Sequence, residues 1–395
     1  MGLLNSIWIA PLICQMKILA IYPESASGIS EIYQRIIFEM AKYATIDTIT
    51  DVAPSPEQSC NGLRNQYHIP ISERDKGWYR RFIRWFAATP VSNAWARKAE
   101  SIAAKDYDII IAFISSSELT PAIAGKYLAE QLGCKFAVYS VDAIPAPGGW
   151  EHGRYYRQKM KVVARTLAGA DFVASSNKHM LAYQLTTFKH KAGLRSGVIY
   201  TPSPNRRYIN PISDEHVLLY TGSLYGLRNP MHLFKAFKRL LREYPEARLL
   251  IVGAKLRLKS RDSIFTSEER KHVELHPHTN DLNPYFARAR VLIDIDADRE
   301  KDPFLSSKVV TYIKANRMIV SETGLDTPSR DMFKGMTTVV QCNHNSESLY
   351  NGLKQALELS ATEQDYSERE ALIELFSIES VCTQFMSYIK ELVEH

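Results

Sequence analysis

Short apolar runs alternate with longer amphipathic stretches along the chain, and this alternation occurs twice. In the first half, aliphatic and β-branched runs predict strands near 17–22, 46–52, 108–113, 135–141, 171–175 and 197–200. Apolar positions at helical spacing between these runs predict helices near 30–44, 119–132, 154–168 and 177–188. Strands that alternate with helices in this way are typical of βαβ units, so we expect a parallel sheet with helices on its faces.

The second half repeats the pattern after a proline-rich stretch near 201–211 that interrupts it. We expect strands near 216–221, 247–252, 271–275, 290–296, 317–321 and 337–341. The helices of this half are expected near 230–243, 280–289, 306–315 and 346–360. A last helical stretch, 378–394, should pack on a domain surface because it carries apolar residues at helical spacing, namely Val381, Phe385, Tyr388, Ile389 and Leu392.

The length of the chain agrees with two domains, because 395 residues exceed what one hydrophobic core usually organises. We expect an α/β protein with two Rossmann-like α/β/α domains that face each other across a cleft. The N-terminal domain would cover 16–203 and the C-terminal domain 204–376. The final segment, 377–395, would form a helix that packs back on the body of the protein.

The first fifteen residues form an apolar leader without a single charge, and Met16 and Lys17 follow at once. A secretory signal normally begins with positive charge, and a membrane-spanning helix needs about 20 apolar residues, so neither description fits. We favour Met16 as the natural start, with residues 1–15 an annotation extension. A leader that associates loosely with a membrane is the alternative.

Composition places the chain among ordinary globular proteins, with 45% hydrophobic and 23% charged residues. Its five cysteines lie far apart and form no C-x-x-C pair. Neither a disulfide framework nor a cysteine zinc site is therefore suggested, and we expect a reducing, cytoplasmic environment.

The excess positive charge is concentrated in one segment. Residues 74–105 hold eight Lys or Arg and two acidic residues, a local charge of +6 that equals the formal net charge of the whole chain. On a helical wheel the run 78–86 separates an aromatic side from an arginine side: Trp78, Phe82, Trp85 and Phe86 against Arg80, Arg81 and Arg84. Such a helix suits an anionic membrane surface, because aromatics settle at the headgroup boundary and arginines meet lipid phosphates.

The alternative for this segment is a helix whose aromatics are buried in the first domain and whose arginines are solvated. Nucleic acid is not expected as a partner, because no RNA- or DNA-binding motif accompanies the basic residues.

Ligands of open α/β sheets bind beyond the carboxyl ends of the strands, so the loops there carry the candidate chemistry. The loop after the first strand contains no G-x-G-x-x-G and gives no support for a dinucleotide-binding dehydrogenase. Its Ser27 and Gly28 precede a helix and would either hydrogen-bond a ligand on the acceptor side or form a simple cap and turn.

The second domain opens with a strand, a glycine turn at Gly222 and Ser223, the basic Arg228 and a helix start near Pro230. Backbone N–H groups near the glycine would meet phosphate oxygens, and the guanidinium would supply a forked cation. This arrangement suits a diphosphate.

The run from Tyr220 to Gly253 resembles the nucleotide-binding half of GT-B glycosyltransferases, particularly the family 4 group. By position Arg228 stands where that family has a lysine, whereas Ser223 replaces its usual arginine. The segment that follows resembles the loop that contacts the nucleotide base, which assigns this role to His276, Pro277 and His278.

The strongest local match begins at Asp302 and extends to Ser321. It resembles the P-F-x-P-S-K motif of polysaccharide-assembling glycosyltransferases. The resemblance assigns Ser306, Ser307 and Lys308 to the donor diphosphate, Thr311 to the place of the ribose-binding glutamate, and Asp302 and Phe304 to the donor sugar. Thr311 in place of the glutamate is a departure from the family pattern.

In the first domain, a predicted strand ends at Asp142, followed by Pro145. Similar enzymes carry an acid or a histidine at this point, so Asp142 is the candidate base that would deprotonate an acceptor hydroxyl. The alternative is an aspartate that caps a turn before the proline. Weaker acceptor-side candidates are Glu118, His152 and Arg154.

The sequence Asp294-Ile-Asp296-Ala-Asp298 superficially resembles a D-x-D metal motif. It lacks the glycine and terminal glutamate of a calcium loop. GT-B enzymes resemble one another in holding the diphosphate with cations and helix ends, so we expect no metal and no cofactor.

The resemblance therefore implies a metal-independent transferase that moves a sugar from a nucleotide-diphosphate donor, a UDP-sugar above all, to a hydroxyl of a glycan. A polyprenyl-diphosphate-linked acceptor at the inner face of the cytoplasmic membrane is the expected setting, with the protein peripherally attached. Two alternatives stay open: a GT-B-fold sugar-nucleotide epimerase, and a non-catalytic membrane-associated scaffold.

Overall fold

The computed structural model describes residues 16–23, 29–51, 62–70, 90–116, 119–150, 156–254 and 263–394. The first fifteen residues, to which the start-site prediction applies, lie outside these ranges. The chain divides into two compact units, unit 1 from Met1–Pro202 with Ile378–His395 and unit 2 from Ser203–Ser377. Each described unit is built on a parallel sheet with helices on it, which confirms the two α/β domains that the alternating pattern predicts.

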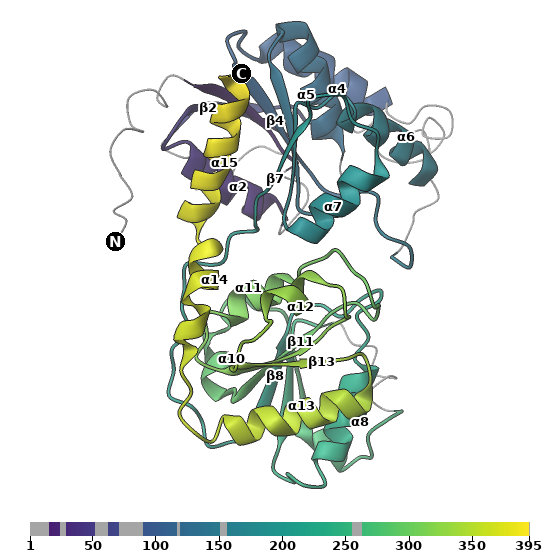
Figure 1. Ribbon diagram of the computed structural model, residues 1–395, viewed down its shortest axis with the longest axis vertical. Helices are drawn as coiled ribbons and strands as arrows, with labels where there is room; N and C mark the ends of the chain where they lie inside the picture. Colours follow the sequence, from purple (N-terminus) through teal and green to yellow (C-terminus); the bar gives the residue numbers. More distant parts are fainter. Residues whose placement is uncertain are drawn as a thin grey trace. The chain divides into compact units, whose positions relative to one another are not determined.

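Unit 1 contains, within the described residues, a seven-stranded parallel sheet of order β3-β2-β1-β4-β5-β6-β7 (Figure 1). The strands are β1 (Lys17–Ile21), β2 (Thr45–Thr50), β3 (Leu63–His68), β4 (Ile109–Ile114), β5 (Lys135–Ser140), β6 (Phe172–Ser175) and β7 (Arg195–Val198). The helices are α2 (Ile29–Met40), α4 (Pro90–Ile102), α5 (Thr120–Leu132), α6 (Tyr156–Leu167), α7 (Lys178–Thr187) and α15 (Ile378–Val393).

Strand β1 shows how the sheet acquires a core on both faces. Ile18 and Ala20 belong to one buried cluster, with residues of α2 and α15. Leu19 and Ile21 belong to a second cluster, with residues of α4 and α5. Successive side chains of a strand point to opposite faces, so a strand that is covered on both sides reads as a continuous apolar run.

The C-terminal helix α15 belongs to unit 1, although the chain leaves that unit near Pro202 and returns only at Ile378. It runs beside α2 in Figure 1. Its Phe385 ring lies 5.7 Å from Tyr139 and 6.2 Å from Phe113, measured between ring centroids. The apolar spacing at the end of the sequence therefore marks a face that completes the core of the first unit.

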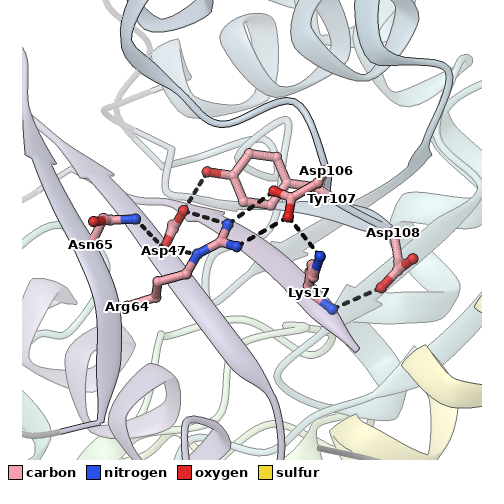
Figure 2. A network of polar contacts seen from close by, with 7 residues as sticks. All are labelled: Lys17, Asp47, Arg64, Asn65, Asp106, Tyr107 and Asp108. Atoms are coloured by element: carbon pink, nitrogen blue, oxygen red, sulfur yellow. Dashed lines mark hydrogen bonds and ion pairs between the residues drawn. The ribbon is translucent and has the colours of Figure 1, made fainter. Parts of the chain in front are cut away.

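The sequence pattern does not reveal β3, because this edge strand is polar and only partly buried. A network of charges attaches it to the sheet (Figure 2). Arg64 donates to both oxygens of the buried Asp47 at 3.0 and 2.8 Å, and also to Asp106. Tyr107 donates to Asp47 at 2.6 Å and Lys17 donates to Asp106 at 2.6 Å. An edge strand without an apolar face is thus stabilised by ion pairs.

Unit 2 contains, among the described residues, a six-stranded parallel sheet of order β10-β9-β8-β11-β12-β13. The strands are β8 (Val217–Thr221), β9 (Arg248–Val252), β10 (Val273–His276), β11 (Val291–Ile295), β12 (Met318–Glu322) and β13 (Val339–Cys342). The helical elements are α8 (Met231–Leu240), η3 (Glu269–His272), α10 (Asn283–Arg288), α11 (Ser307–Tyr312), α12 (Pro328–Met332), α13 (Ser346–Leu359), η4 (Tyr366–Arg369) and α14 (Glu370–Leu375).

Helices α8 and α13 pack together on one face of this sheet and share a buried cluster with it. On the other face the Tyr208 and Phe286 rings are stacked with centroids 4.2 Å apart, and Tyr312 contacts Phe286 edge-on. The helix expected over 306–315 ends at Tyr312, because the backbone at Lys314 and Asn316 bonds to Tyr208 instead of continuing the helix.

The strand expected over 197–200 lies earlier in the chain, because β7 pairs with β6 from Arg195 onward. Two short helices, α12 and α14, and helix α4 are absent from the sequence prediction.

Candidate functional site

Two adjacent strands of unit 2 end in glycine turns. Gly222 follows β8 with a φ of 98°, and its N–H donates to the Val252 carbonyl at 2.8 Å. Gly253 follows β9 with a φ of 87°, and its N–H donates to the His276 carbonyl at 3.0 Å. Positive φ favours glycine, and the two turns place half-buried glycines without side chains at the carboxyl edge of the sheet, where α/β proteins bind ligands.

A cavity of about 170 Å³ opens at this edge. Five predicted site residues line it: Gly222, His278, Ser307, Lys308 and Thr311. Five others that line it were not predicted: Thr221, Val252, Gly253, Thr279 and Leu282. Four of the missed residues, all but Leu282, lie at or shortly after the ends of β8, β9 and β10, so reading every position there could have found them.

Lys308 lies in the first turn of α11 and points across the end of β8. Its Nζ is 5.2 Å from the Tyr220 ring centroid and 3.6 Å from Asp294 Oδ1. Only 9% of the side chain is exposed, and this burial lowers the pKa of the Lys308 amine while Asp294 acts against the shift. A buried amine that borders an open cavity is suited to bind an anion, because the oxygens of the anion would replace the water molecules that burial removes from the amine.

Arg228 does not line the cavity, but it lies close to the carboxylates of Asp294 and Asp296. Its guanidinium carbon is 5.5 Å from the Tyr225 ring centroid. Burial lowers the pKa of Arg228, but the charges of Asp296, Tyr225 and Asp294 outweigh burial and the net pKa is raised. Asp294 is thus a neighbour of both cations that the sequence assigns to the diphosphate.

The remaining predicted donor residues lie outside the cavity lining. Ser223 is exposed, and its carbonyl accepts from the Tyr220 hydroxyl at 3.0 Å. Ser306 is buried and donates to Asp294 Oδ1 at 2.8 Å, so its hydroxyl is directed into the protein. Asp302 is buried too, and its carboxylate accepts from the Phe304 N–H at 3.0 Å.

The two predicted base-contacting residues next to His278 also face elsewhere. His276 Nε2 is 3.3 Å from Glu274, and its ring packs edge-on against Tyr285. Pro277 is exposed. The structure therefore brings His278, but not its two predecessors, to the cavity.

Asp142, the candidate base, follows the end of β5 in unit 1. Its Oδ2 accepts from both the N–H and the hydroxyl of Ser116, each at 2.9 Å. Among the described residues no hydrogen bond reaches Oδ1. The Asp142 carbonyl accepts from Ser140 and Gln184 at 2.7 and 3.2 Å. The carboxylate is therefore half-buried and fixed in position, with one oxygen available for an acceptor hydroxyl.

The other acceptor-side and membrane residues lie outside the described ranges. They are Ser27, Gly28, Glu118, His152 and Arg154, and the aromatic and basic set Trp78, Arg80, Arg81, Phe82, Arg84, Trp85 and Phe86. In the part of the chain that the structure covers, no helix has the length and hydrophobicity that crossing a bilayer requires. In the same part, no group of three or more His, Cys, Asp or Glu side chains is placed to hold a metal ion.

A second cavity, of about 370 Å³, lies beyond β11, β12 and β13. None of the predicted site residues lines it. Its lining consists of Asp298, Arg299, Glu300, Thr323, Gly324, Leu325, Asn343 and His344.

No known family model matches the chain, and no curated protein matches it significantly in sequence. Solved structures match it over nearly its whole length. HepE from Anabaena, solved with UDP, has a TM-score of 0.71 at 14% identity and covers 95% of this chain and 100% of its own. TarM has a TM-score of 0.72 at 9% identity and covers 96% and 99%. The lipopolysaccharide galactosyltransferase WaaB has a TM-score of 0.65 at 13% identity and covers 95% and 99%.

The chain has the GT-B fold. Membership of family 4 within that fold stays a prediction, since the similarity is one of structure at low identity. The GT-B fold also occurs in other activities: a Listeria monocytogenes structure described as a putative UDP-N-acetylglucosamine 2-epimerase matches with a TM-score of 0.59 at 13% identity, and it covers 96% of this chain and 97% of its own. The fold alone therefore does not choose between transfer and epimerisation.

Proposed function

We propose that this protein is a glycosyltransferase that moves a sugar from a UDP-sugar donor to a hydroxyl of a glycan or lipid-linked oligosaccharide in surface polysaccharide biosynthesis. The observation that carries the proposal is the cavity in unit 2, where two glycine turns and the buried Lys308 amine meet. HepE, which shares the fold, has been solved with UDP, and this supports uracil as the base of the donor nucleotide.

The chemistry of the cavity suits the leaving group of such a reaction. The amine of Lys308 would bind diphosphate oxygens, the turns at Gly222 and Gly253 would leave room for the ligand beside it, and Thr311 and His278 would contact the nucleoside. Fixed donors in a partly dry site stabilise charge that develops on the leaving diphosphate, an effect often worth several kcal/mol. Asp142 would take the proton of the acceptor hydroxyl through Oδ1.

The proposed acceptor and the proposed membrane location rest on the sequence alone. The basic aromatic segment 78–86 would attach the protein peripherally to the inner face of the cytoplasmic membrane, where a polyprenyl-diphosphate-linked acceptor is presented. No metal and no cofactor enter the proposed reaction, because Lys308 and Arg228 supply the positive charge.

The proposal is tested with the full-length protein by titrating UDP and by assaying sugar transfer from UDP-glucose, UDP-galactose and UDP-N-acetylglucosamine to lipid-linked acceptors. We expect UDP to bind and one donor to be consumed only when an acceptor is present. Lys308→Ala should abolish both, whereas Lys334→Ala, which removes an exposed lysine of the same unit, should leave both unchanged. Equal UDP binding by the two variants would contradict the assignment of the cavity.

The same experiment separates the alternatives. An epimerase would convert a UDP-sugar to its epimer without any acceptor. A scaffold would bind no UDP, and its thermal unfolding would not respond to any nucleotide.

A further inference from the structure

Two buried carboxylates stand directly behind the cations of the proposed diphosphate site. Asp294 and Asp296 lie at the carboxyl end of β11 with exposed fractions of 0% and 1%. Ile295 between them belongs to the core that α8 and α13 cover. Because side chains alternate along a strand, the Asp294 carboxylate is directed toward the opposite face, where it contacts Lys308 of α11. Asp296 follows the last residue of the strand.

Asp294 is the nearer neighbour of Lys308. Its Oδ1 accepts from the Ser306 hydroxyl at 2.8 Å and lies 3.6 Å from Lys308 Nζ. Its Oδ2 is buried and has no hydrogen-bond partner among the described residues. A buried carboxylate oxygen without a hydrogen-bond partner costs free energy.

Asp296 is held by neutral donors. Its Oδ1 accepts from the Ala297 N–H at 3.0 Å and its Oδ2 from the Ser329 hydroxyl at 3.4 Å. Burial, followed by the negative charge of Asp294, raises the pKa of Asp296 to about 7. Asp302 adds to this shift and Arg228 opposes it.

The charged and titratable groups around the pair come from every element packed against it. They are Lys308 and Tyr312 from α11, Tyr220 from β8, Arg228 from the loop before α8, and Asp302 from the loop after β11. Only Lys308 and Arg228 carry positive charge. Three carboxylates, Asp294, Asp296 and Asp302, therefore lie among two cations when no ligand is bound.

We infer that Asp294 and Asp296 are positioning residues that hold Lys308 and Arg228 in the empty site, and that a bound diphosphate replaces them as counter-ion while the pair takes up a proton. This inference rests on the proposed function, because it concerns the same diphosphate site. The proton comes from solvent and goes to a carboxylate oxygen, and no bond of the ligand breaks. The cause is electrostatic, since the ligand brings negative charge next to two carboxylates that share its cations.

The amount of proton uptake depends on pH in a definite direction. Below about pH 6 Asp296 already carries its proton in the empty site, so binding adds almost none. At about pH 8 Asp296 is mostly ionised in the empty site, and binding should take up between a half and one proton. The terminal phosphate of UDP is fully ionised at that pH and does not account for the uptake.

The test is calorimetric titration of the full-length protein with UDP, and separately with ADP, at pH 8.0 in buffers of different ionisation enthalpy. The slope of the apparent binding enthalpy against that ionisation enthalpy gives the number of protons taken up. We expect about 0.5–1 for the natural protein and a value near zero for Asp296→Asn. Lys334→Ala, which removes an exposed lysine of the same unit away from the two carboxylates, should keep the slope of the natural protein.

The outcomes separate this inference from the proposed function. Binding of UDP or ADP at pH 8.0 without proton uptake overturns the inference and leaves the proposed function intact. ADP binding with uptake but no UDP binding supports the inference and overturns the uridine part of the function. Binding of neither ligand overturns both. If Asp296→Asn does not fold, as judged by circular dichroism, Asp294→Asn takes its place, and an unchanged slope in the folded variant overturns the inference.

Discussion

Lys308 packs so closely over Gly222 that a Cβ atom added at the glycine would come within 3.3 Å of Lys308 Cδ. The glycine also has a φ of 98°, which L side chains rarely adopt. Gly222→Ala should therefore both strain the turn, by about 1–3 kcal/mol of stability, and displace the lysine. We expect UDP affinity, measured by calorimetry, to fall about tenfold or more, which corresponds to about 1.4 kcal/mol.

Gly133→Ala is the matched control for this variant. Gly133 ends α5 with a φ of 67°, and a Cβ there would meet no atom within 4 Å. Its substitution should lower the melting temperature through backbone strain without a change in UDP affinity. If both variants lose the same affinity, loss of stability explains the effect and the contact with Lys308 does not.

Asp142→Asn tests the candidate base. The amide keeps the shape of the carboxylate and can still bond to Ser116, but it cannot accept a proton from the acceptor. We expect kcat for sugar transfer to fall by about 10²–10⁴. UDP affinity should stay unchanged, because the cavity lies in unit 2 and Asp142 in unit 1.

Ser116→Ala removes one of the two hydrogen bonds to Asp142 and keeps the carboxylate. Its kcat should fall far less than that of Asp142→Asn. Transfer at the natural rate by folded Asp142→Asn would show that the carboxylate serves only to join the loops after β4 and β5.

The network around Arg64 predicts a contribution to acid stability. Hydrogen bonds from Arg64 and then Lys17 lower the pKa of Asp106 to about 2, below the value of about 3.9 for an unfolded chain. A lowered folded-state pKa stabilises the fold above the unfolded pKa, and this stabilisation is lost as the pH falls through the folded pKa. Asp106→Asn should thus flatten the dependence of stability on pH between about 4 and 2. Equal slopes for both proteins in urea unfolding across that range would contradict the role of the network.

Helix α15 provides a test of how the chain end completes unit 1. A Cβ atom at Gly197 would come within 2.6 Å of the Tyr388 ring. Gly197→Ala should therefore destabilise the protein by about 1–3 kcal/mol, because the ring must move away from β7. In a Tyr388→Ala background the same substitution should cost much less, since the clash is gone. A cost that is the same in both backgrounds, measured by denaturant unfolding, would place the strain elsewhere.

The sequence by itself determined the class of fold, because an apolar run that is buried on both faces of a parallel sheet has to consist of successive large aliphatic residues. The glycine turn after a strand drew attention to Gly222, and the resemblance to glycosyltransferases to His278, Ser307, Lys308 and Thr311, and all five line one cavity. Strand β3 could not be predicted from an apolar pattern, because its Arg64 pairs with Asp47 and Asp106, which lie far away in the sequence.

The tertiary structure alone decided which of the candidates meet. Ser306 and Asp302 match the motif by position, yet the fold turns the serine to Asp294 and the aspartate to its own loop. Asp294 and Asp296 superficially resemble a metal motif in the sequence. The fold places them beside Lys308 and Arg228. The physical reason is that pairing of buried charges depends on distances between atoms on different strands and helices. These distances cannot be derived from the spacing of residues along the chain.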